Sequence, residues 1–588
     1  MRNCVVRLTV VCLLVMGGLV SDLSAQLLPD QRVQDFQNLA ALYVKRYAPY
    51  EWKRHIFGFD LLDITPWLDR VRAAKDDLEF FEIQAEYVAK LNDIHSGFQM
   101  TSNFTANLGM TVDIYDGKVL IDSINRTLLP VASFPFQIGD ELVSVDGRSA
   151  EDWITVISKW RQRGNPSNTR RFAAGQITVR NQNIFPRAVE IGSTAAVVIR
   201  RANGDLQTFT IPWTKSGVPV YAVGPVPLPR TSVMASTASS SDRDSLVTLE
   251  GMNNWKLRED DPSLQPIPWA TDGDGRPRKY ILGYGARTPH FRAGFPSNFV
   301  QRLGLNATDF HFSGTYQAEG LTIGFLRFPN FAPPATALDE LDREIDYLAR
   351  STDALVIDVT RNTGGGCYML DAAARLIPFP FYFFGEQVRV TQDRINLYQS
   401  QADLARATNL PDWIINAWQL YADQLRAAYN TNRGLSVPIP NCRQTGSNWP
   451  PLMFDNAPGP VVYTKPMIIL IDEFSTSAGD IFPAMLQDNR RAPLVGVTSN
   501  GGGGSTSLWP TGFYSESISS NTNTLVVRKD LILTQDFPPS PYIENIGARP
   551  DVPLEYMTRE NLLNGGRTYV EGFTTVLTQW VKTLQTPR

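Results

Sequence analysis

Two serines at the end of a strongly apolar segment are the residues of this chain best suited to nucleophilic chemistry. Residues 467–471 are all apolar and predict a fully buried strand, and residues 478–487 then have the pattern of a helix. Ser475 and Ser477 lie between them, beside the unpaired N–H groups of a helix N-terminus, where negative charge is favoured. A serine there can attack a carbonyl and leave an oxyanion near those N–H groups, although serines at this place are also common helix caps.

Serine chemistry also requires a base and a carboxylate that orients the base. The chain has four histidines, His55, His95, His290 and His311. A single histidine usually has a structural or surface role, but His95 lies in a short polar turn between a predicted helix and a β-rich segment. Glu544 is the candidate carboxylate, whereas composition alone would place a glutamate on the surface.

Consecutive glycines supply candidate oxyanion donors. Residues 354–359 predict a second buried strand, which leads through residues 360–366 (TRNTGGG) into a helix over residues 367–377. Glycines let the backbone approach a bound group closely with its N–H groups exposed. A tight turn is the alternative, but one glycine would suffice for it. A phosphate-binding loop is not expected, because the lysine that usually accompanies one is missing from this segment.

The composition describes an ordered protein of several domains. The chain has 588 residues, 43% hydrophobic and 19% charged, which is too long for a single core. A net charge of −4 and the lack of a Lys/Arg-rich run argue against nucleic-acid binding. The histidines and cysteines have no metal-ligand spacing, so neither a metal nor another cofactor is expected. Cys367 and Cys442 allow at most one disulfide in the mature protein.

The N-terminus has the pattern of a secretory signal. Arg2 and Arg7 precede an apolar run over residues 8–20, and small residues follow it. We therefore predict a signal peptide over residues 1–25 and an exported mature protein, with an uncleaved anchor as the alternative. No later segment has 18 consecutive apolar residues, as a membrane span requires.

The elements that must position the candidate residues fall into three predicted domains. Residues 26–100 have helical periodicity, residues 101–222 predict a β-rich module, and residues 320–588 alternate short strands with helices. Between them, residues 223–319 predict a linker and an inserted segment. The predicted fold class is therefore α/β and multidomain.

The β-rich module contains a pattern similar to that of PDZ domains. Residues 138–147 (IGDELVSVDG) resemble their signature strand and turn. Leu108, Gly109 and Met110 stand where such domains keep a loop of amides for a peptide carboxylate, which makes them candidate substrate-binding residues. Residues 161–187 are interpreted as an insertion that alters the peptide groove.

Together these segments resemble the tail-specific, or C-terminal-processing, serine peptidases. The family pattern is an Asp-x-x-x-Asn-x-Gly-Gly strand and turn, a serine-rich turn followed by Gln-Asp, and then a glycine-rich loop. Residues 358–365, 475–488 and 500–504 match it in that order. The resemblance covers most of the chain and implies a crotonase-type α/β catalytic domain over residues 320–588.

The base distinguishes two branches of this family. The bacterial processing branch uses a lysine in the glycine-rich loop, but the equivalent place here is Gly502, and residues 466–528 contain no lysine. The chain instead resembles the tricorn-type branch, and most closely its chlamydial type, which combines a serine, a histidine and a glutamate. Carried over, these are Ser477 as nucleophile, His95 as base and Glu544 as the orienting carboxylate.

The resemblance implies several further properties. The backbone N–H groups of Gly365 and Ala478 would form the oxyanion hole, and protein or peptide substrates would be the partners of a homodimeric enzyme. The mature enzyme would act in the periplasm, on the cell surface or outside the cell. An internal segment would be cut out before activity, with residues 232–241 as the candidate nick site. Two alternatives remain at this stage: a peptide- or hydrophobic-ligand-binding scaffold, and a crotonase-like lyase or hydratase.

Overall fold

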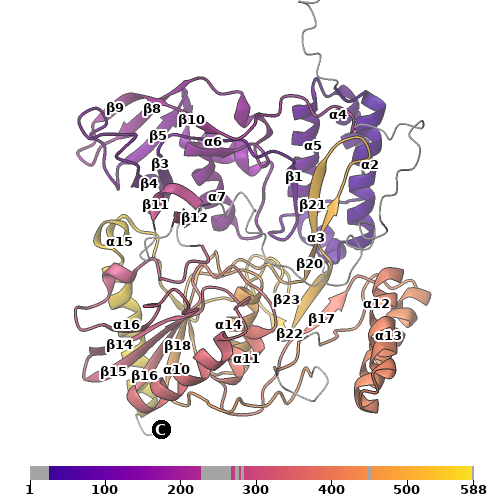
Figure 1. Ribbon diagram of the computed structural model, residues 1–588, viewed down its shortest axis with the longest axis vertical. Helices are drawn as coiled ribbons and strands as arrows, with labels where there is room; N and C mark the ends of the chain where they lie inside the picture. Colours follow the sequence, from indigo (N-terminus) through magenta and orange to yellow (C-terminus); the bar gives the residue numbers. More distant parts are fainter. Residues whose placement is uncertain are drawn as a thin grey trace, which may run out of the picture.

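The computed structural model describes residues 26–226, 266–271, 277–279, 284–440, 442–445 and 452–585. N-terminal helices and a β-rich module form one half of the molecule, and an α/β sheet with its helices forms the other (Figure 1). The predicted multidomain α/β fold class is thereby confirmed. The predicted signal peptide and the candidate nick site lie outside the described residues.

A seven-stranded mixed sheet forms the centre of the C-terminal half (Figure 1). Its strands pair antiparallel from β13 to β15 and parallel from β15 onward. In spatial order the strands are β13 (Val300–Leu303), β14 (Phe312–Ala318), β15 (Leu321–Arg327), β16 (Ala354–Asp358), β18 (Met467–Ile471), β19 (Leu494–Gly496) and β24 (Val552–Pro553).

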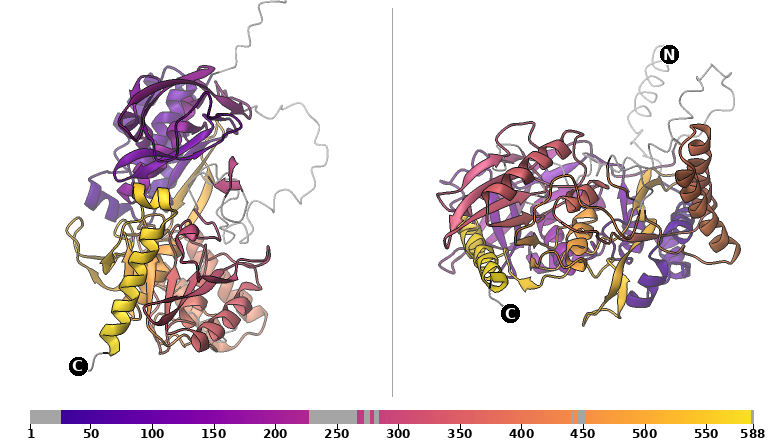
Figure 2. Two further views of the ribbon diagram at one scale, coloured as in Figure 1. Left: turned by 90° about the vertical axis from the view of Figure 1, so that its left-hand side faces the viewer. Right: turned by 90° about the horizontal axis from the view of Figure 1, so that it is seen from below.

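Helices cover both faces of this sheet, which explains the unbroken apolar runs of its central strands. Ile469 and Ile471 belong to the core beneath one group of helices, whereas Ile468 and Leu470 belong to the core beneath α16. Strands buried on both faces have continuous rather than alternating hydrophobic sequences. Figure 2 (left) shows α16 running along the C-terminal half towards the end of the chain. The helices are α10 (Ala337–Ser351), α11 (Tyr368–Ala374) and α14 (Ala478–Asp488) on one face, and α16 (Arg567–Gln585) on the other.

The sheet begins earlier in the sequence than residue 320, the predicted start of the catalytic domain. β14 and β15 form a hairpin in continuous register from Phe312↔Arg327 to Ala318↔Leu321. Glu319 and Gly320 form its turn, and both have positive φ values, of 48° and 80°. The boundary at residue 320 therefore falls inside a hairpin, and part of the predicted inserted segment belongs to the catalytic sheet.

The N-terminal helices and the β-rich module share one hydrophobic core. The helices are α2 (Pro29–Arg46), α3 (Tyr50–Phe57), α4 (Thr65–Ala73) and α5 (Asp77–Ala89). The strands of the module are β3 (Met110–Tyr115), β4 (Lys118–Ile124), β5 (Glu141–Val145), β8 (Thr194–Arg200) and β9 (Leu206–Pro212), in that spatial order, with β6 (Arg148–Ser149) beside β5. The module also contains α6 (Ala150–Ser158), α7 (Pro166–Thr178) and the short 3₁₀ helix η1 (Pro186–Val189).

A sheet formed from both ends of the chain joins the two halves. β1 (Gly97–Met100) pairs antiparallel with β21 (Ser517–Thr522), which pairs with β20 (Thr506–Pro510). Figure 1 shows this C-terminal hairpin extending up beside α2 and β1. Asp35 of α2 accepts hydrogen bonds from the backbone N–H groups of residues 513–515, at the tip of the hairpin. The N-terminal region is therefore built into the C-terminal half rather than linked to it by a tether.

The remaining elements surround these sheets. Two helices form an antiparallel pair at one side of the C-terminal half (Figure 2, right). They are α12 (Gln392–Ala407) and α13 (Asp412–Asn430). No helix in the described ranges is long and apolar enough to cross a membrane. The smaller elements are β2 (Thr105–Asn107), β7 (Val179–Asn181), β10 (Thr214–Ser216), β11 (Pro266–Thr271), β12 (Pro277–Lys279), η3 (Arg292–Gly294), β17 (Gly385–Val388), β22 (Thr524–Ile532), β23 (Ser540–Tyr542) and α15 (Arg559–Asn564).

Candidate active site

Ser477 occupies a strained turn between β18 and α14. Its φ and ψ are 59° and −119°, a conformation that residues other than glycine rarely adopt. The residue is partly exposed, whereas Ser475 is completely buried. The Ser475 hydroxyl donates to the carbonyl oxygen of Val359 at 2.8 Å and accepts from the backbone N–H of Asp472 at 3.1 Å. Of the two candidate serines, only Ser477 has a hydroxyl that a substrate can reach.

Asp480 holds the serine turn against the glycine-rich loop. Its carboxylate accepts from the backbone N–H of Ser477 at 2.8 Å, and from those of Gly501 and Gly502 at 2.8 and 3.0 Å. Burial raises the pKa of Asp480 to about 6, although these hydrogen bonds oppose the shift. Ser477 and Asp480 have the Ser-x-x-Asp spacing of a helix cap, so the sequence carried a signal for this contact.

The glycine turn before α11 lies against the serine turn. A Cβ added to Gly364 would lie only 2.6 Å from the Ser477 Cβ, and Gly364 has a φ of 82°. The carbonyl oxygen of Asn362 accepts from Thr476 N–H at 3.0 Å and fixes the two turns together. Within the described chain, neither the Gly365 N–H nor the Ala478 N–H donates to a protein acceptor. Both predicted oxyanion donors thus keep an N–H hydrogen that no acceptor uses. Only a glycine at position 364 permits the two turns to approach so closely.

His95 lies on the other side of the glycine-rich loop. Its backbone N–H donates to Asp93 at 2.8 Å, and its carbonyl oxygen accepts from Thr506 Oγ1 of β20 at 3.2 Å. A Cβ added to Gly502 would lie 3.4 Å from His95 Cε1 and equally 3.4 Å from the Cγ2 of Thr476, the neighbour of Ser477. In the bacterial branch the lysine base occupies the position of Gly502. In this chain that position therefore lies directly beside the imidazole of His95.

The imidazole of His95 is buried and favours its neutral form. Burial lowers the pKa of His95, and the positive charges of Lys53 and Arg163 lower it further against the opposing effect of Asp93. The Nδ1 atom is buried and has no hydrogen-bond partner in the part of the chain that the structure describes. A neutral imidazole with a free nitrogen is the form that a general base requires.

Glu544 is fully buried beside the same loop. One carboxylate oxygen accepts from the backbone N–H of Gly503 at 3.1 Å, and the other forms an ion pair with Lys53. Burial raises the pKa of Glu544 to about 7, and Asp93 contributes in the same direction while Lys53 opposes it. No hydrogen bond joins Glu544 to His95, or His95 to Ser477, among the described residues.

The three predicted catalytic residues thus gather around residues 500–504 without a direct bond between them. A carboxylate has about four acceptor sites, so Glu544 can accept from His95 in addition to its present partners. Catalytic hydrogen bonds are often long or absent without substrate and shorten in the complex. The arrangement is compatible with a serine, histidine and glutamate relay that closes by a small movement.

The other histidines have different surroundings. His55 is exposed on α3, and the ring of His290 packs against that of Tyr556 at 4.0 Å between centroids. His311 is fully buried and bonded through Nδ1 to Glu340 at 2.7 Å and through Nε2 to Tyr368 at 2.9 Å. None of these contacts reaches the serine turn.

The predicted carboxylate loop of the PDZ module is partly occupied by the chain itself. The N–H of Leu108 donates to the carbonyl oxygen of Thr178 at 3.0 Å, and the N–H of Gly109 donates to Asn107 Oδ1 at 3.3 Å. Leu108 and Met110 are buried. Thr178 is the last residue of α7, which belongs to the predicted insertion, so the insertion takes up an amide that a peptide carboxylate would use.

The same insertion reaches the segments on either side of the serine turn. Arg171 of α7 forms buried ion pairs with Asp113 of β3, at 2.6 Å, and with Glu473, at 2.9 Å, four residues before Ser477. Asn165, the cap of α7, donates to the carbonyl oxygen of Ser499 at 3.1 Å. The sequence showed these residues only as ordinary charged or polar positions, because nothing in their local pattern indicates a partner some 300 residues away.

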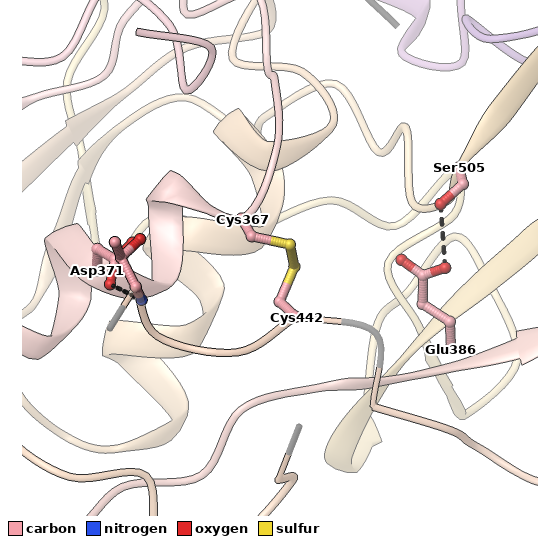
Figure 3. The surroundings of a disulfide bond; sticks show 6 residues. Cys367, Asp371, Glu386, Cys442 and Ser505 are labelled. Atoms are coloured by element: carbon pink, nitrogen blue, oxygen red, sulfur yellow. Dashed lines mark hydrogen bonds between the residues drawn. A yellow bond between two sulfur atoms is a disulfide. The ribbon is translucent and has the colours of Figure 1, made fainter. Parts of the chain in front are cut away.

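A disulfide fixes the far end of the glycine turn (Figure 3). Cys367, two residues after Gly365, is bonded to Cys442. Beside it, the Asp371 carboxylate accepts from the backbone N–H of Thr445 at 2.8 Å and from its hydroxyl at 2.7 Å. The one bridge that the sequence allowed is therefore formed, and it joins the predicted oxyanion turn to the loop after α13.

Comparisons with known proteins define the class to which this fold and site belong. Residues 322–553 match the model of peptidase family S41, and residues 104–221 match that of a PDZ domain. Residues 322–553 therefore form a serine-type peptidase domain of family S41 and residues 104–221 a PDZ domain, which confirms the predicted resemblance to the tail-specific peptidases. Protein substrates follow from this family.

Proteins of Chlamydia species are among the relatives of this chain. The chain is 25% identical over 594 residues to a protein of Chlamydia pneumoniae, covering 95% of this chain and 91% of the relative. It is also 25% identical to a protein of Chlamydia trachomatis serovar D, covering 92% and 91%. The crystal structure of mature CPAF, the chlamydial protease-like activity factor, shares the fold with a TM-score of 0.70 at 20% identity, over 95% of this chain and 99% of that one. A structure of mature CPAF complexed with lactacystin has a TM-score of 0.68 at 20% identity, over 94% and 99%.

Proposed function

We propose that this chain is an exported serine endopeptidase in which Ser477 attacks the peptide carbonyl. His95 takes the proton of the Ser477 hydroxyl and then delivers it to the leaving amine. Glu544 orients the imidazole and stabilises its charged form. The N–H groups of Gly365 and Ala478 receive the oxyanion, and water then hydrolyses the acyl-enzyme.

The geometry of the serine turn carries this proposal. Ser477 is the accessible hydroxyl of the turn, held in a strained conformation beside two N–H groups without acceptors. The strain supports a functional role, because such a conformation persists only where its surroundings enforce it. Asp480 and Asn362 provide that enforcement through the backbone of both turns.

Labelling with a fluorophosphonate probe tests the nucleophile directly. The wild-type protein should be labelled at Ser477, and Ser477→Ala should lose both labelling and turnover, since removing a triad member costs on the order of 10⁴ in rate. Ser475→Ala is the matched control, because its hydroxyl is buried and bonded to Val359. Labelling that survives in Ser477→Ala but disappears in Ser475→Ala would reverse the assignment. Since a structure of mature CPAF contains lactacystin, protection from the probe by lactacystin is a second measurement.

Export is supported by two independent features. The N-terminal residues have the pattern of a signal peptide, and the Cys367–Cys442 disulfide is typical of an oxidising compartment. Mass spectrometry of the protein recovered outside the cytoplasm should give an N-terminus at Gln26. A mature protein that begins at Met1 would contradict cleavage.

Activation by removal of an internal segment belongs to the same proposal. Residues 232–241 form the Ser/Thr/Ala-rich tract in which we expect the cut. Peptidase activity should rise as the full-length band is converted to fragments during limited proteolysis. Full activity of an uncut chain would dismiss this step.

A further inference from the structure

Lys53 is a buried cation directly behind the predicted catalytic carboxylate. It lies on α3, with a side chain that is 1% exposed, and its ammonium forms an ion pair with Glu544. The same nitrogen donates to Asn545 Oδ1 at 2.6 Å and to the carbonyl oxygen of Asn92 at 2.9 Å. These three acceptors use all three of its hydrogens, and a lysine is almost never fully buried unless it is paired in this way.

The acceptors belong to the two segments that must meet for catalysis. Asn92 precedes the turn that carries His95, whereas Glu544 and Asn545 come from the C-terminal half. The Nδ2 of Asn545 also donates to the Asn92 carbonyl oxygen, at 2.9 Å. The Lys53 ammonium therefore joins the segment of the base to the segment of the carboxylate.

We propose that Lys53 is a positioning residue of the peptidase reaction, which keeps Glu544 ionised and holds it beside the turn of His95. This inference rests on the function proposed above for Ser477, His95 and Glu544. Lys53 itself touches neither the serine turn nor the glycine turn in the described chain, so it acts through the carboxylate rather than on the substrate.

The charges around Glu544 explain why such a cation is needed. The negative charge of Asp93 raises the pKa of Glu544 together with burial, and Lys53 supplies the opposing positive charge. Burial already raises the pKa of Glu544 to about 7 in the presence of Lys53. Without that cation the pKa would rise further, and a protonated Glu544 cannot stabilise a positively charged imidazole.

The surroundings of His95 lead to the same expectation. The charged groups that act on its imidazole are Asp93, Lys53 and Arg163. Removing Lys53 would raise the pKa of His95 slightly and also that of Glu544, so both changes move the active form to higher pH. The rise of activity on the acid side of the pH profile should therefore occur at a higher pH.

A purely structural role for Lys53 predicts a different result. Loss of one partner of a buried ion pair destabilises a protein, and a destabilised enzyme loses activity by a similar factor at every pH. The test must therefore measure how pH and Glu544 change the effect of the substitution, and not only the loss of activity.

The experiment measures the rate of fluorophosphonate labelling of the full chain between about pH 5 and pH 10. Lys53→Met should label at least about fivefold more slowly at pH 7 and recover towards the wild-type rate as the pH rises, since a rise of one unit from a pKa of about 7 lowers the ionised fraction of Glu544 at that pH from about one half to about one eleventh. In a Glu544→Gln background, the further change Lys53→Met should alter the rate less than about twofold, because the charge on which Lys53 acts is gone. Lys465→Met is the matched control, since Lys465 donates to the Thr352 carbonyl oxygen far from the site, and it should behave as wild type.

Each other outcome overturns the inference. An equal loss at every pH, or the same loss in the Glu544→Gln background, would reduce Lys53 to a structural ion pair. An unchanged Lys53→Met profile would remove it from the reaction altogether. If Lys53→Met does not fold, the double variant Lys53→Met with Glu544→Gln should fold, because it has no unpaired buried carboxylate. In that case the inference is contradicted if the double variant labels much more slowly than Glu544→Gln alone. Failure of the wild-type protein to label at Ser477 would instead refute the proposed function, so the two failures are distinguishable.

Discussion

Reduction of the Cys367–Cys442 disulfide should destabilise the C-terminal half without rearranging its loop. The two cysteines are 75 residues apart in sequence, and the loop-closure entropy for that length corresponds to about 4.5 kcal/mol at 25 °C. The Asp371 carboxylate still binds Thr445 after reduction, because these bonds do not involve sulfur. The cost therefore comes mainly from the greater freedom of the unfolded chain.

Urea denaturation of oxidised and reduced protein, followed by tryptophan fluorescence, measures this difference. We expect a free energy of unfolding lower by about 4 kcal/mol for the reduced protein, and the same decrease for the variant Cys367→Ser with Cys442→Ala. Thiol titration must confirm complete reduction. Equal midpoints for the two forms would refute the entropic reasoning.

Three further predictions concern the loops around the site. Gly502→Ala places a Cβ 2.6 Å from the Cγ2 of Ile94, the neighbour of His95, so the turn that carries His95 must shift. The labelling rate should fall more than about tenfold with unchanged secondary structure, and a normal rate would show that this turn has room to move. Arg171→Met leaves Glu473 buried without its cation and should cost about 3–5 kcal/mol in urea denaturation, so a cost below 1 kcal/mol would mean that water replaces the ion pair. The raised pKa of Glu544, about 7 against an ordinary 4.5, contributes stability that is full below pH 4.5 and lost as the pH rises through about 7. In the wild-type protein the urea midpoint should therefore fall between about pH 5 and pH 8, and in Glu544→Gln it should fall less. An equally steep fall in Glu544→Gln would mean that other groups cause the pH dependence.

The central strands of the catalytic sheet could be predicted from the sequence because helices bury both of their faces. Strands β16 and β18 are covered on both faces, so their sequences are continuous apolar runs that end at the residues of the two functional turns. The glycines of residues 364–366 were equally informative, because positive φ and a close approach to Ser477 restrict the first of them to glycine. Local sequence was sufficient here because burial on both faces and a positive φ each restrict the residue types within a few consecutive positions.

Sequence reasoning failed where the constraint comes from a distant partner. β13 and β14 were missed as parts of the sheet because their composition is mixed and they pair at its edge. Lys53 lies in a charged stretch that resembles a solvated helix face, yet its side chain is buried. Only the position of Glu544, 491 residues later, turns that lysine into the partner of a buried carboxylate.

The insertion in the PDZ module has a physical explanation in this arrangement. Its helix α7 uses Arg171 to bind Asp113 on the edge strand of the module and Glu473 beside the serine turn, while Asn168 donates to the Glu473 carbonyl oxygen at 2.8 Å. A minimal PDZ domain would leave that edge strand free for a peptide. In this chain the same surface instead supports the segment that positions Ser477. The module therefore packs against the segment that precedes the serine turn, and a change at its edge strand has a direct route to that turn through one buried guanidinium.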